Sequence, residues 1–248
     1  MSIDPYAGNL DFWEKAAATH GVAEDSEHYK FDKILAGGTL MTPTEQRAVA
    51  AATGGTDDDP LAGVRGLDVL YLQSHLGADG VVMARAGARM TCADFSATAL
   101  RRARELAEQV GVEIETVETD SRAIPESLYG RFDLVYVTVG AICWIDDLDR
   151  WMQQVSLALR PGGRFVFATG PMPRPNEPWF WMSHGFNAVM RMRNALLRPQ
   201  FIMYYNTFTW PEVRPLLERH GLSVEARTGI CPAPYERAAI VVATKGAR

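Results

Sequence analysis

Residues 66–96, with the sequence GLDVLYLQSHLGADGVVMARAGARMTCADFS, constrain the fold of this chain more than any other segment. The pattern predicts an apolar strand, a tight turn, a short helix and a second strand that ends at Asp94. Open α/β sheets bind adenosine-type ligands through such a unit, beyond the carboxyl ends of the strands. Asp94 follows the turn at 73–77 by the roughly 20 residues that let a carboxylate accept hydrogen bonds from a ribose. Its alternative role is a helix N-cap, which aspartate also favours.

The turn itself argues against a dinucleotide as the ligand. A pyrophosphate needs the pattern G-x-G-x-x-G, whose glycines let the backbone approach the phosphates. Here the turn reads QSHLG over residues 73–77 and holds one glycine. A ligand with a ribose and an adenine but no pyrophosphate makes no such demand. S-adenosylmethionine is the candidate that fits this description.

The remaining pattern predicts a doubly wound α/β sheet, because strands alternate with helices and parallel strands need such crossovers. We expect strands at 67–72, 88–93, 112–117, 132–138, 163–169, 222–228 and 238–244, and helices at 78–87, 97–110, 146–159 and 211–220. Two helices are expected earlier, one at 11–19 and one that begins at a capping box of Thr42 and Glu45. Length alone favours one domain with decorations.

Several segments carry a resemblance to a known family. Residues 70–79, LYLQSHLGAD, resemble the first motif of a bacterial subgroup of class I S-adenosylmethionine-dependent methyltransferases. That subgroup has LxLQCHxGxD in place of the commoner DxGxGxG, and Ser74 stands where it has cysteine. Four further segments match it in order, namely ILAGGTLMTPTE (34–45), MTCADFS (90–96), FDLVYVTVGAICWIDDLDRW (132–151) and LRPGGRF (159–165).

The resemblance covers most of the chain and implies the architecture of that family. It implies a seven-stranded Rossmann-like sheet, mostly parallel, with an antiparallel last strand. The expected single methyltransferase domain has an N-terminal helical cap (1–60), a cofactor-binding core (61–170), an aromatic-rich insertion after the fifth strand (171–210) and a C-terminal helix with strands (211–248).

The predicted cofactor site gathers residues at the strand ends. Asp94 is expected to bind the ribose, and the turn to line the methionine end, where Gly77 lets the backbone approach the ligand. A plain turn glycine is the alternative for Gly77. The resemblance implies that Asp120 and the backbone of Ser121 bind the adenine. The predicted cofactor-binding residues are Gln73, Ser74, His75, Gly77, Asp94, Phe95, Asp120, Ser121 and Val139.

The acceptor is expected beside the aromatic-rich insertion. Aromatic side chains there could wall an apolar pocket, or form the core of a small helical insertion. Trp144, in the segment after the fourth strand, either lines the acceptor side or packs against the next helix. The predicted acceptor-binding residues are Trp144, Trp179, Trp181, Phe186 and Tyr204.

Methyl transfer needs a base only if the acceptor atom must lose a proton. The candidates for this role are His20, His28, Tyr29, His75 and His184, and we favour His184 in the insertion and His28 and Tyr29 in the cap. For His75 the expected role is to position the cofactor or pack the turn.

The composition limits the classes of ligand and partner that we expect this protein to bind. The net charge of −5 gives no global basic field for nucleic acid. The three cysteines form no metal-binding or disulfide pattern, so no metal is expected. Neither a signal peptide nor a membrane span is evident, and a cytoplasmic location is the default. The oligomeric state is left open, a homodimer included.

The leading hypothesis is an enzyme that methylates an O or N atom of a small, partly aromatic molecule, such as a secondary metabolite. Two alternatives stay open at this point. One is a methyltransferase for RNA or protein, supported only by arginines at 191, 193 and 198. The other is a protein that binds the cofactor without methyl transfer, which the unusual first motif suggests.

Overall fold

The chain folds around a seven-stranded sheet with the order β3-β2-β1-β4-β5-β7-β6. The structure is a computed structural model and describes residues 5–21, 29–171, 189, 192, 208, 210–228 and 238–247. The strands are β1 (Asp68–Leu72), β2 (Arg89–Asp94), β3 (Ile114–Glu118), β4 (Phe132–Val137), β5 (Leu159–Pro171), β6 (Leu222–Thr228) and β7 (Ala238–Lys245). β7 runs antiparallel to β5 and β6, and the other pairs are parallel. The predicted fold class is therefore confirmed.

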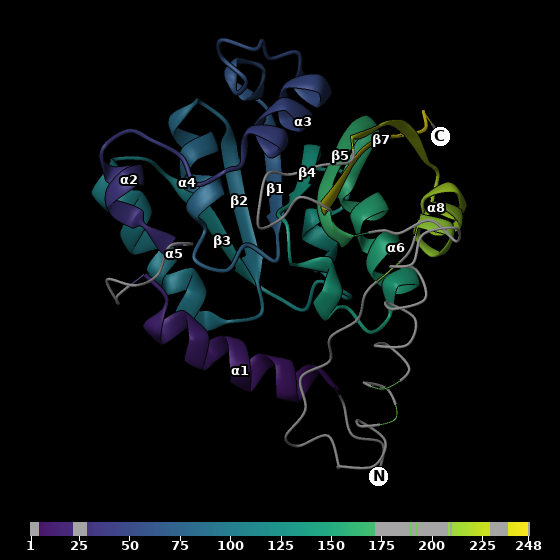
Figure 1. The fold of residues 1–248 in the computed structure, drawn as a ribbon, viewed down its shortest axis with the longest axis horizontal. Coiled ribbons are helices and arrows are strands. Elements are labelled where there is room, and N and C mark those ends of the chain that lie inside the picture. Colours follow the sequence, from purple (N-terminus) through teal and green to yellow (C-terminus); the bar gives the residue numbers. More distant parts are fainter. Residues whose placement is uncertain are drawn as a thin grey trace.

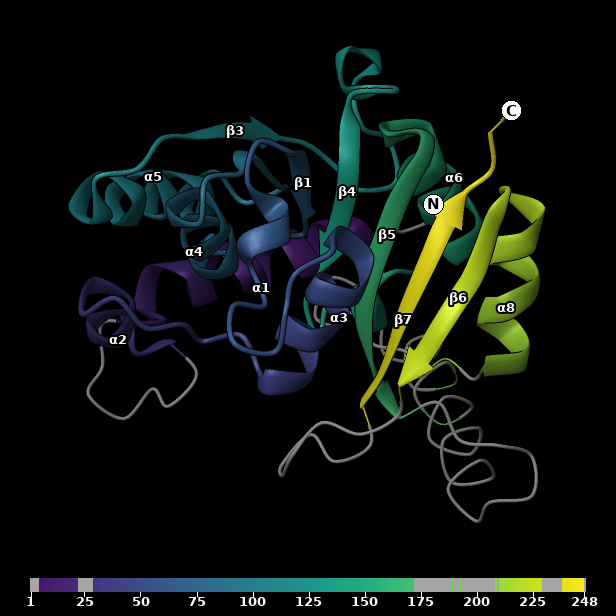
Figure 2. The ribbon, with the colours of Figure 1, turned by 90° about the horizontal axis from the view of Figure 1, so that it is seen from above.

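Helices cover both faces of this sheet. They are α1 (Pro5–Thr19), α2 (Phe31–Leu35), α3 (Pro43–Thr53), α4 (Ala78–Arg85), α5 (Ala97–Val110), α6 (Leu148–Ala158) and α8 (Trp210–Arg219). One apolar cluster joins α6 and α8 to alternate residues of β1, β4, β5 and β7. A second cluster joins α3 and α4 to the intervening strand residues. Figure 2 shows the consequence, with α3 and α6 on opposite sides of β5.

Local signals explain where several helices begin and end. The Thr42 hydroxyl accepts a hydrogen bond from the Glu45 backbone, and the Glu45 carboxylate accepts one from the Thr42 backbone. This confirms the predicted capping box at the start of α3. Gly111 ends α5 with φ of +76°, a conformation that glycine adopts at little cost.

Two elements extend beyond their predicted bounds. Helix α1 begins at Pro5 rather than at residue 11. Its first turns include Gly8 and Asn9, which are weak helix formers, but the Asn9 side chain donates to the Trp144 carbonyl oxygen across the site. Strand β5 begins at Leu159, before the Pro-Gly-Gly that predicted a turn, and a register shift lies between β4 and β5 there.

Helix α1 lies across the end of the sheet at which β1, β2 and β4 terminate (Figure 1). Contacts to three different post-strand residues hold it there. Tyr6 meets the Phe95 ring edge-on, Asn9 binds Trp144, and Trp13 meets the His75 ring at 5.0 Å. The cap helix therefore closes the edge of the sheet where the sequence predicts the ligand.

Candidate cofactor and acceptor site

The turn after β1 has an unusual backbone. Gln73 and His75 have φ values of +58° and +46°, in the left-handed region that favours glycine. Such a conformation costs roughly 1–2 kcal/mol at a residue with a Cβ atom. Both side chains are anchored: the Gln73 amide donates to the Ala141 carbonyl oxygen at 3.0 Å, and His75 Nε2 lies 3.0 Å from His20 Nδ1. Strain of this kind collects at functional sites.

Gly77 is required by packing. A Cβ atom on Gly77 would lie 2.6 Å from the Cβ of Ala103, and its φ is +68°. Helix α4 therefore approaches α5 too closely for any side chain here. Gly77 does not line the three cavities described below. The predicted approach of its backbone to a ligand stays a prediction, and the close contact of the helices accounts for the glycine without it.

Asp94 is held by the main chain. Its side chain is 7% exposed, Oδ2 accepts a hydrogen bond from the His75 backbone at 2.8 Å, and Oδ1 accepts one from the Ser96 backbone at 2.9 Å. The alternative role as N-cap of α5 is wrong, because Ser96 caps that helix through Ala99. Burial raises the pKa of Asp94 to about 6 although these backbone donors oppose the rise.

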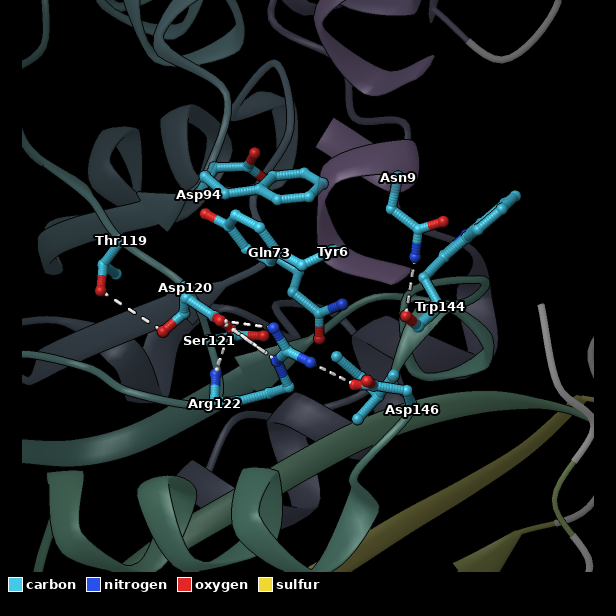
Figure 3. A pocket seen from close by; sticks show the side chains of 12 residues that line it. Tyr6, Asn9, Gln73, Asp94, Thr119, Asp120, Ser121, Arg122, Trp144 and Asp146 are labelled. Atoms are coloured by element: carbon cyan, nitrogen blue, oxygen red, sulfur yellow. Dashed lines mark hydrogen bonds and ion pairs between the residues drawn. The ribbon is translucent and has the colours of Figure 1, made fainter. Parts of the chain in front are cut away.

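A first cavity, the β2–β3 cavity, lies beside Asp94 (Figure 3). It is lined by Tyr6, Asn9, Gln73, Asp94, Phe95, Thr119, Asp120, Ser121, Arg122, Trp144, Ile145 and Asp146. Three residues of the predicted cofactor-binding set, Phe95, Asp120 and Ser121, thus line the same cavity as Asp94. The Tyr6 and Phe95 rings lie edge to face at 5.5 Å and give this cavity an aromatic wall.

Asp120 is already engaged by a neighbour. Its Oδ2 accepts from Arg122 Nη2 at 2.7 Å and its Oδ1 from the Arg122 backbone at 2.8 Å. The same guanidinium binds Asp146 and lies 5.2 Å from the centre of the Tyr6 ring. The hydrogen bonds that Arg122 donates to Asp120 and Asp146 raise the pKa of its guanidinium, so this arginine stays charged. Arg122 therefore fixes the orientation of the carboxylate that is predicted to meet an adenine.

A second cavity, the β1–β4 cavity, continues from Asp94 across the end of β1. Its lining residues are Trp13, Tyr29, Gln73, His75, Asp94, Phe95, Thr138, Val139, Gly140, Ala141 and Trp144. A third, the α3–α4 cavity, shares Trp13, Tyr29, His75, Val139 and Trp144 with it. The three cavities are contiguous through shared lining residues and together form one site along the carboxyl ends of the strands.

A histidine pair joins the cap to the turn. The His20 ring stacks on Tyr29 at 4.4 Å and meets the His75 ring at 5.2 Å. Burial, His20 and Arg102 lower the pKa of His75 to about 3. His75 therefore stays neutral at physiological pH, which suits a positioning role better than that of a proton acceptor.

The structure brings together part of the predicted acceptor and catalytic set. Tyr29 and Trp144 both line the β1–β4 and α3–α4 cavities. Val139 lines both as well, and its backbone N–H donates to Glu45 Oε1 at 3.2 Å. The remaining predicted residues lie outside the described part of the chain, namely His28, His184, Trp179, Trp181, Phe186 and Tyr204.

Several lining residues were missed by sequence reasoning. Tyr6, Asn9 and Trp13 come from α1, whose sequence carries no motif that points to a site. Glu45 was recognised as part of a capping box, yet its second oxygen binds Thr138 and Val139 at the end of β4. Arg122 follows Asp120 by two residues, so its charge was the one local signal that could have indicated an ion pair.

Two further observations concern other kinds of site. Among the described residues, no group of three histidine, cysteine, aspartate or glutamate side chains is arranged to hold a metal ion. None of the helices described has both the length and the apolar character needed to cross a membrane.

The residues present fit a ligand with a ribose and an amino acid end. Asp94 offers buried acceptors for hydroxyl groups, and the aromatic wall of the β2–β3 cavity suits an adenine. Within the described structure, Gln73 Oε1 is a buried side-chain atom without a hydrogen-bond partner. Such an atom is costly unless a ligand or water satisfies it. Gln73 belongs to the turn that was predicted to contact S-adenosylmethionine.

Comparison with known proteins agrees with this geometry. A family model described as a methyltransferase domain matches residues 69–163, from β1 to the start of β5. The ubiquinone biosynthesis O-methyltransferase of Erwinia tasmaniensis is 28% identical over 160 residues. That alignment covers 64% of this chain and 65% of the relative, so less than two thirds of the relative's length is matched.

Solved structures share the fold. Magnesium protoporphyrin IX methyltransferase from Synechocystis PCC 6803, with bound S-adenosylhomocysteine, superposes with a TM-score of 0.64 at 14% identity, over 98% of this chain and all of that one. An S-adenosylmethionine-dependent methyltransferase from Mesorhizobium loti gives a TM-score of 0.56 at 20% identity, over 73% and 92% of the two chains.

Residues 69–163 thus match a methyltransferase domain, and the sheet has the fold of class I S-adenosylmethionine-dependent methyltransferases. The cofactor of this class is S-adenosylmethionine, as the expected ribose and turn contacts indicated. The narrower subgroup with the LxLQCHxGxD motif and the identity of the acceptor are matters of proposal.

Proposed function

We propose that this chain transfers a methyl group from S-adenosylmethionine to an oxygen or nitrogen atom of a small, partly aromatic molecule. The observation that carries the proposal is the lining of the β1–β4 and α3–α4 cavities. Trp13, Tyr29 and Trp144 wall both of them, and no lysine or arginine is among their described lining residues. Flat indole and phenol faces suit an aromatic acceptor, whereas a nucleic acid phosphate demands cationic side chains.

The known relatives support the same substrate class. The ubiquinone biosynthesis O-methyltransferase and the magnesium protoporphyrin IX methyltransferase are named for small acceptors with rings. At 28% and 14% identity these names indicate a class of acceptor and no particular compound. Secondary metabolism is the setting we propose, and a single domain made of cap, core, insertion and C-terminal part is the proposed organisation.

The proposed roles follow the order of the three cavities. Asp94 binds the ribose hydroxyls, and Asp120, Ser121 and Phe95 surround the adenine. Gln73, Ser74, His75 and Val139 line the methionine end. The bound cofactor supplies an electrophilic methyl group and a thioether leaving group. The chain itself aligns the acceptor atom and excludes water. This alignment lowers the barrier of the displacement by several kcal/mol.

An acceptor hydroxyl needs a proton acceptor, and among the described candidates we favour Tyr29. Its ring lines both the β1–β4 and the α3–α4 cavity and stacks on the His20 ring at 4.4 Å. His28 precedes it in the chain, and His184 belongs to the predicted insertion, so both stay candidates. An acceptor amine that is neutral would need none of these bases.

The test is a transfer assay with S-adenosylmethionine labelled in its methyl group. The protein is incubated in parallel with a small-metabolite extract, with total RNA and with a protein lysate. We expect label in a small product that organic solvent extracts. Label in RNA or protein alone would replace this acceptor class by a macromolecule. Tight cofactor binding without any transfer would favour a binding protein.

A further inference from the structure

One arginine, Arg122, binds three separate segments of the chain around the β2–β3 cavity. Figure 3 shows its guanidinium between Asp120, in the loop after β3, and Asp146, in the segment after β4. The same group lies 5.2 Å from the centre of the Tyr6 ring, which belongs to α1. All three partners line the cavity, and the Arg122 side chain is only 15% exposed. A single side chain thus connects parts of the cavity wall that lie far apart in the sequence.

The contact with Asp120 fixes both oxygens of that carboxylate. Arg122 Nη2 lies 2.7 Å from Oδ2, and Nε lies 3.1 Å from each oxygen. The Arg122 backbone N–H also donates to Oδ1, at 2.8 Å. A planar guanidinium that meets a carboxylate through two N–H groups fixes its orientation more strictly than an ammonium does. Asp120 is still 26% exposed, so its carboxylate can accept a further N–H group from a ligand in the cavity.

The charges around the β2–β3 cavity show what this arrangement needs from Arg122. The described lining residues include three carboxylates, those of Asp94, Asp120 and Asp146, and Arg122 is the one basic residue among them. Without the guanidinium, Asp120 and Asp146 would lose the cation that they share and would repel each other. Both carboxylates are about a quarter exposed, at 26% and 25%, so each could turn towards water. The present orientation of Asp120 therefore depends on Arg122.

The third partner of Arg122 belongs to the cap helix. Tyr6 lies in the first turn of α1, and its ring meets Phe95 at 5.5 Å as well as the guanidinium at 5.2 Å. A cation beside the face of an aromatic ring attracts that ring. The position of the first turn of α1 is therefore linked to the residue that orients Asp120.

We propose that Arg122 is a positioning residue that couples recognition of the adenine amino group to docking of the cap helix. It holds Asp120 in the orientation that accepts an N–H group, and it holds α1 against the same cavity through Tyr6. The inference rests on the proposed function, from which it takes the place of Asp120 beside the adenine. Arg122 acts on the base through Asp120.

The experiment measures how well the protein distinguishes adenosine from purine riboside, which lacks only the 6-amino group. Each nucleoside displaces labelled S-adenosylhomocysteine, and the ratio of the two affinities reports the contact with the amino group. The variants are Arg122→Met, Asp120→Asn and the two combined. Arg131→Met is the matched control, because Arg131 pairs with Glu115 at 2.8 Å and lies 5.2 Å from the Phe132 ring. It is not among the described lining residues of the three cavities.

The wild type should bind adenosine roughly tenfold more tightly than purine riboside, because the amino group donates to a charged acceptor. Arg122→Met should lower this ratio to about 2 or less, since Asp120 is then no longer oriented. The control should keep the wild-type ratio. In the Asp120→Asn background, Arg122→Met should change the ratio no further, because both act through one contact. A loss of folding stability alone would weaken both nucleosides equally and leave the ratio unchanged.

Amide hydrogen exchange over residues 5–19 measures the docking of α1. At saturation, adenosine should slow this exchange more than purine riboside does in the wild type and in Arg131→Met. The difference between the two nucleosides should disappear in Arg122→Met. Equal protection of α1 by both nucleosides in the wild type would overturn the coupling to the cap.

Two results would overturn the role of Arg122 while leaving the proposed methyl transfer intact. One is an affinity ratio near 1 in the wild type, and the other is a ratio that Arg122→Met leaves unchanged. If Arg122→Met does not fold, Arg122→Lys takes its place, and the ratio should still fall about threefold because an ammonium cannot make the two-pronged contact. Failure of S-adenosylhomocysteine to bind would overturn the proposed function together with this inference.

Discussion

Each end of the site contains a buried aspartate, and the two carboxyl groups have different hydrogen-bond partners. At the ribose end, Asp94 accepts hydrogen bonds from two backbone amides, those of His75 and Ser96. At the other end, beside α3 and α4, Asp79 is bound by the phenols of Tyr71 and Tyr136 and lies near Glu45. Burial raises the pKa of both carboxyls, to about 6 for Asp94 and to about 7 for Asp79.

The difference shows how the partners of a buried acid decide its role. A backbone amide can only donate, so it favours the carboxylate, and it is fixed by the chain. A phenol can donate or accept, so it suits an acid with or without its proton. The surroundings of Asp94 therefore favour its anionic form at neutral pH. Those of Asp79 accommodate both its protonated and its ionised form.

The largest expected effect is on the pH dependence of folding. The folded-state pKa of Asp79 is raised from 3.8 to about 7, so its contribution to the unfolding free energy is present at low pH and is lost as the pH rises through about 7. Asp79→Asn removes this loss. In urea denaturation without ligand, the free energy of unfolding of the variant should rise relative to that of the wild type between pH 4 and 7, by up to about 4 kcal/mol. Equal pH profiles of the two proteins would contradict the assignment.

The next effect concerns affinity at the ribose end. Asp94→Ala removes a charged acceptor that the ribose hydroxyls need, and hydrogen bonds to charged groups contribute roughly 1.5–3 kcal/mol each. We expect S-adenosylhomocysteine and methylthioadenosine to bind about 100-fold more weakly in calorimetry, because both carry the ribose. Asp79→Asn should spare methylthioadenosine. Loss of affinity for both nucleosides in both variants would mean that the two aspartates do not act separately.

A smaller effect distinguishes the ends by pH alone. Because burial raises the pKa of Asp94 to about 6, the carboxylate that binds the ribose is lost as the pH falls through that value. Methylthioadenosine should therefore bind equally at pH 7 and 8 and lose about tenfold in affinity between pH 7 and pH 5. A fluorescence or calorimetric titration series checks this, with Asp94→Asn as the variant in which the dependence disappears.

The smallest expected effect concerns the turn that joins the two ends. His75 has φ of +46°, which alanine adopts at a cost and glycine adopts freely. Both His75→Ala and His75→Gly lose the contact with His20, so their difference isolates the backbone. Thermal or urea unfolding should find the glycine variant more stable than the alanine variant by about 1 kcal/mol. The reverse order would show that the left-handed turn is not strained.

Local patterns predicted the fold well because they act over a few residues. The capping box of Thr42 and Glu45, the left-handed Gly111 and the antiparallel β7 are all present as expected. The same reasoning fails where a side chain has a distant partner. Glu45 binds Val139 across 94 positions of the chain, and Asn9 binds Trp144 across 135. No period or motif encodes such a contact.

The candidate site was predicted in part for the same reason. Asp94 and the turn follow from the spacing within one strand–helix–strand unit, and Asp120 follows from the family resemblance. The walls contributed by α1 depend on how a helix docks on the sheet. Gly77 shows a further limit: the sequence has a glycine beside the expected ligand, but the contact with Ala103 in α5 becomes visible only in three dimensions.

Gln73 and His75 occupy left-handed positions of the turn, where glycine is the usual residue. Their side chains therefore affect the entropy of ligand binding. They fasten the turn to Ala141 and His20, so its conformation does not depend on a bound molecule. A flexible glycine loop would lose conformational entropy on binding, whereas a loop held by these hydrogen bonds is already ordered and loses little. The entropic penalty of docking a nucleoside here should be small, with rapid, nearly rigid association.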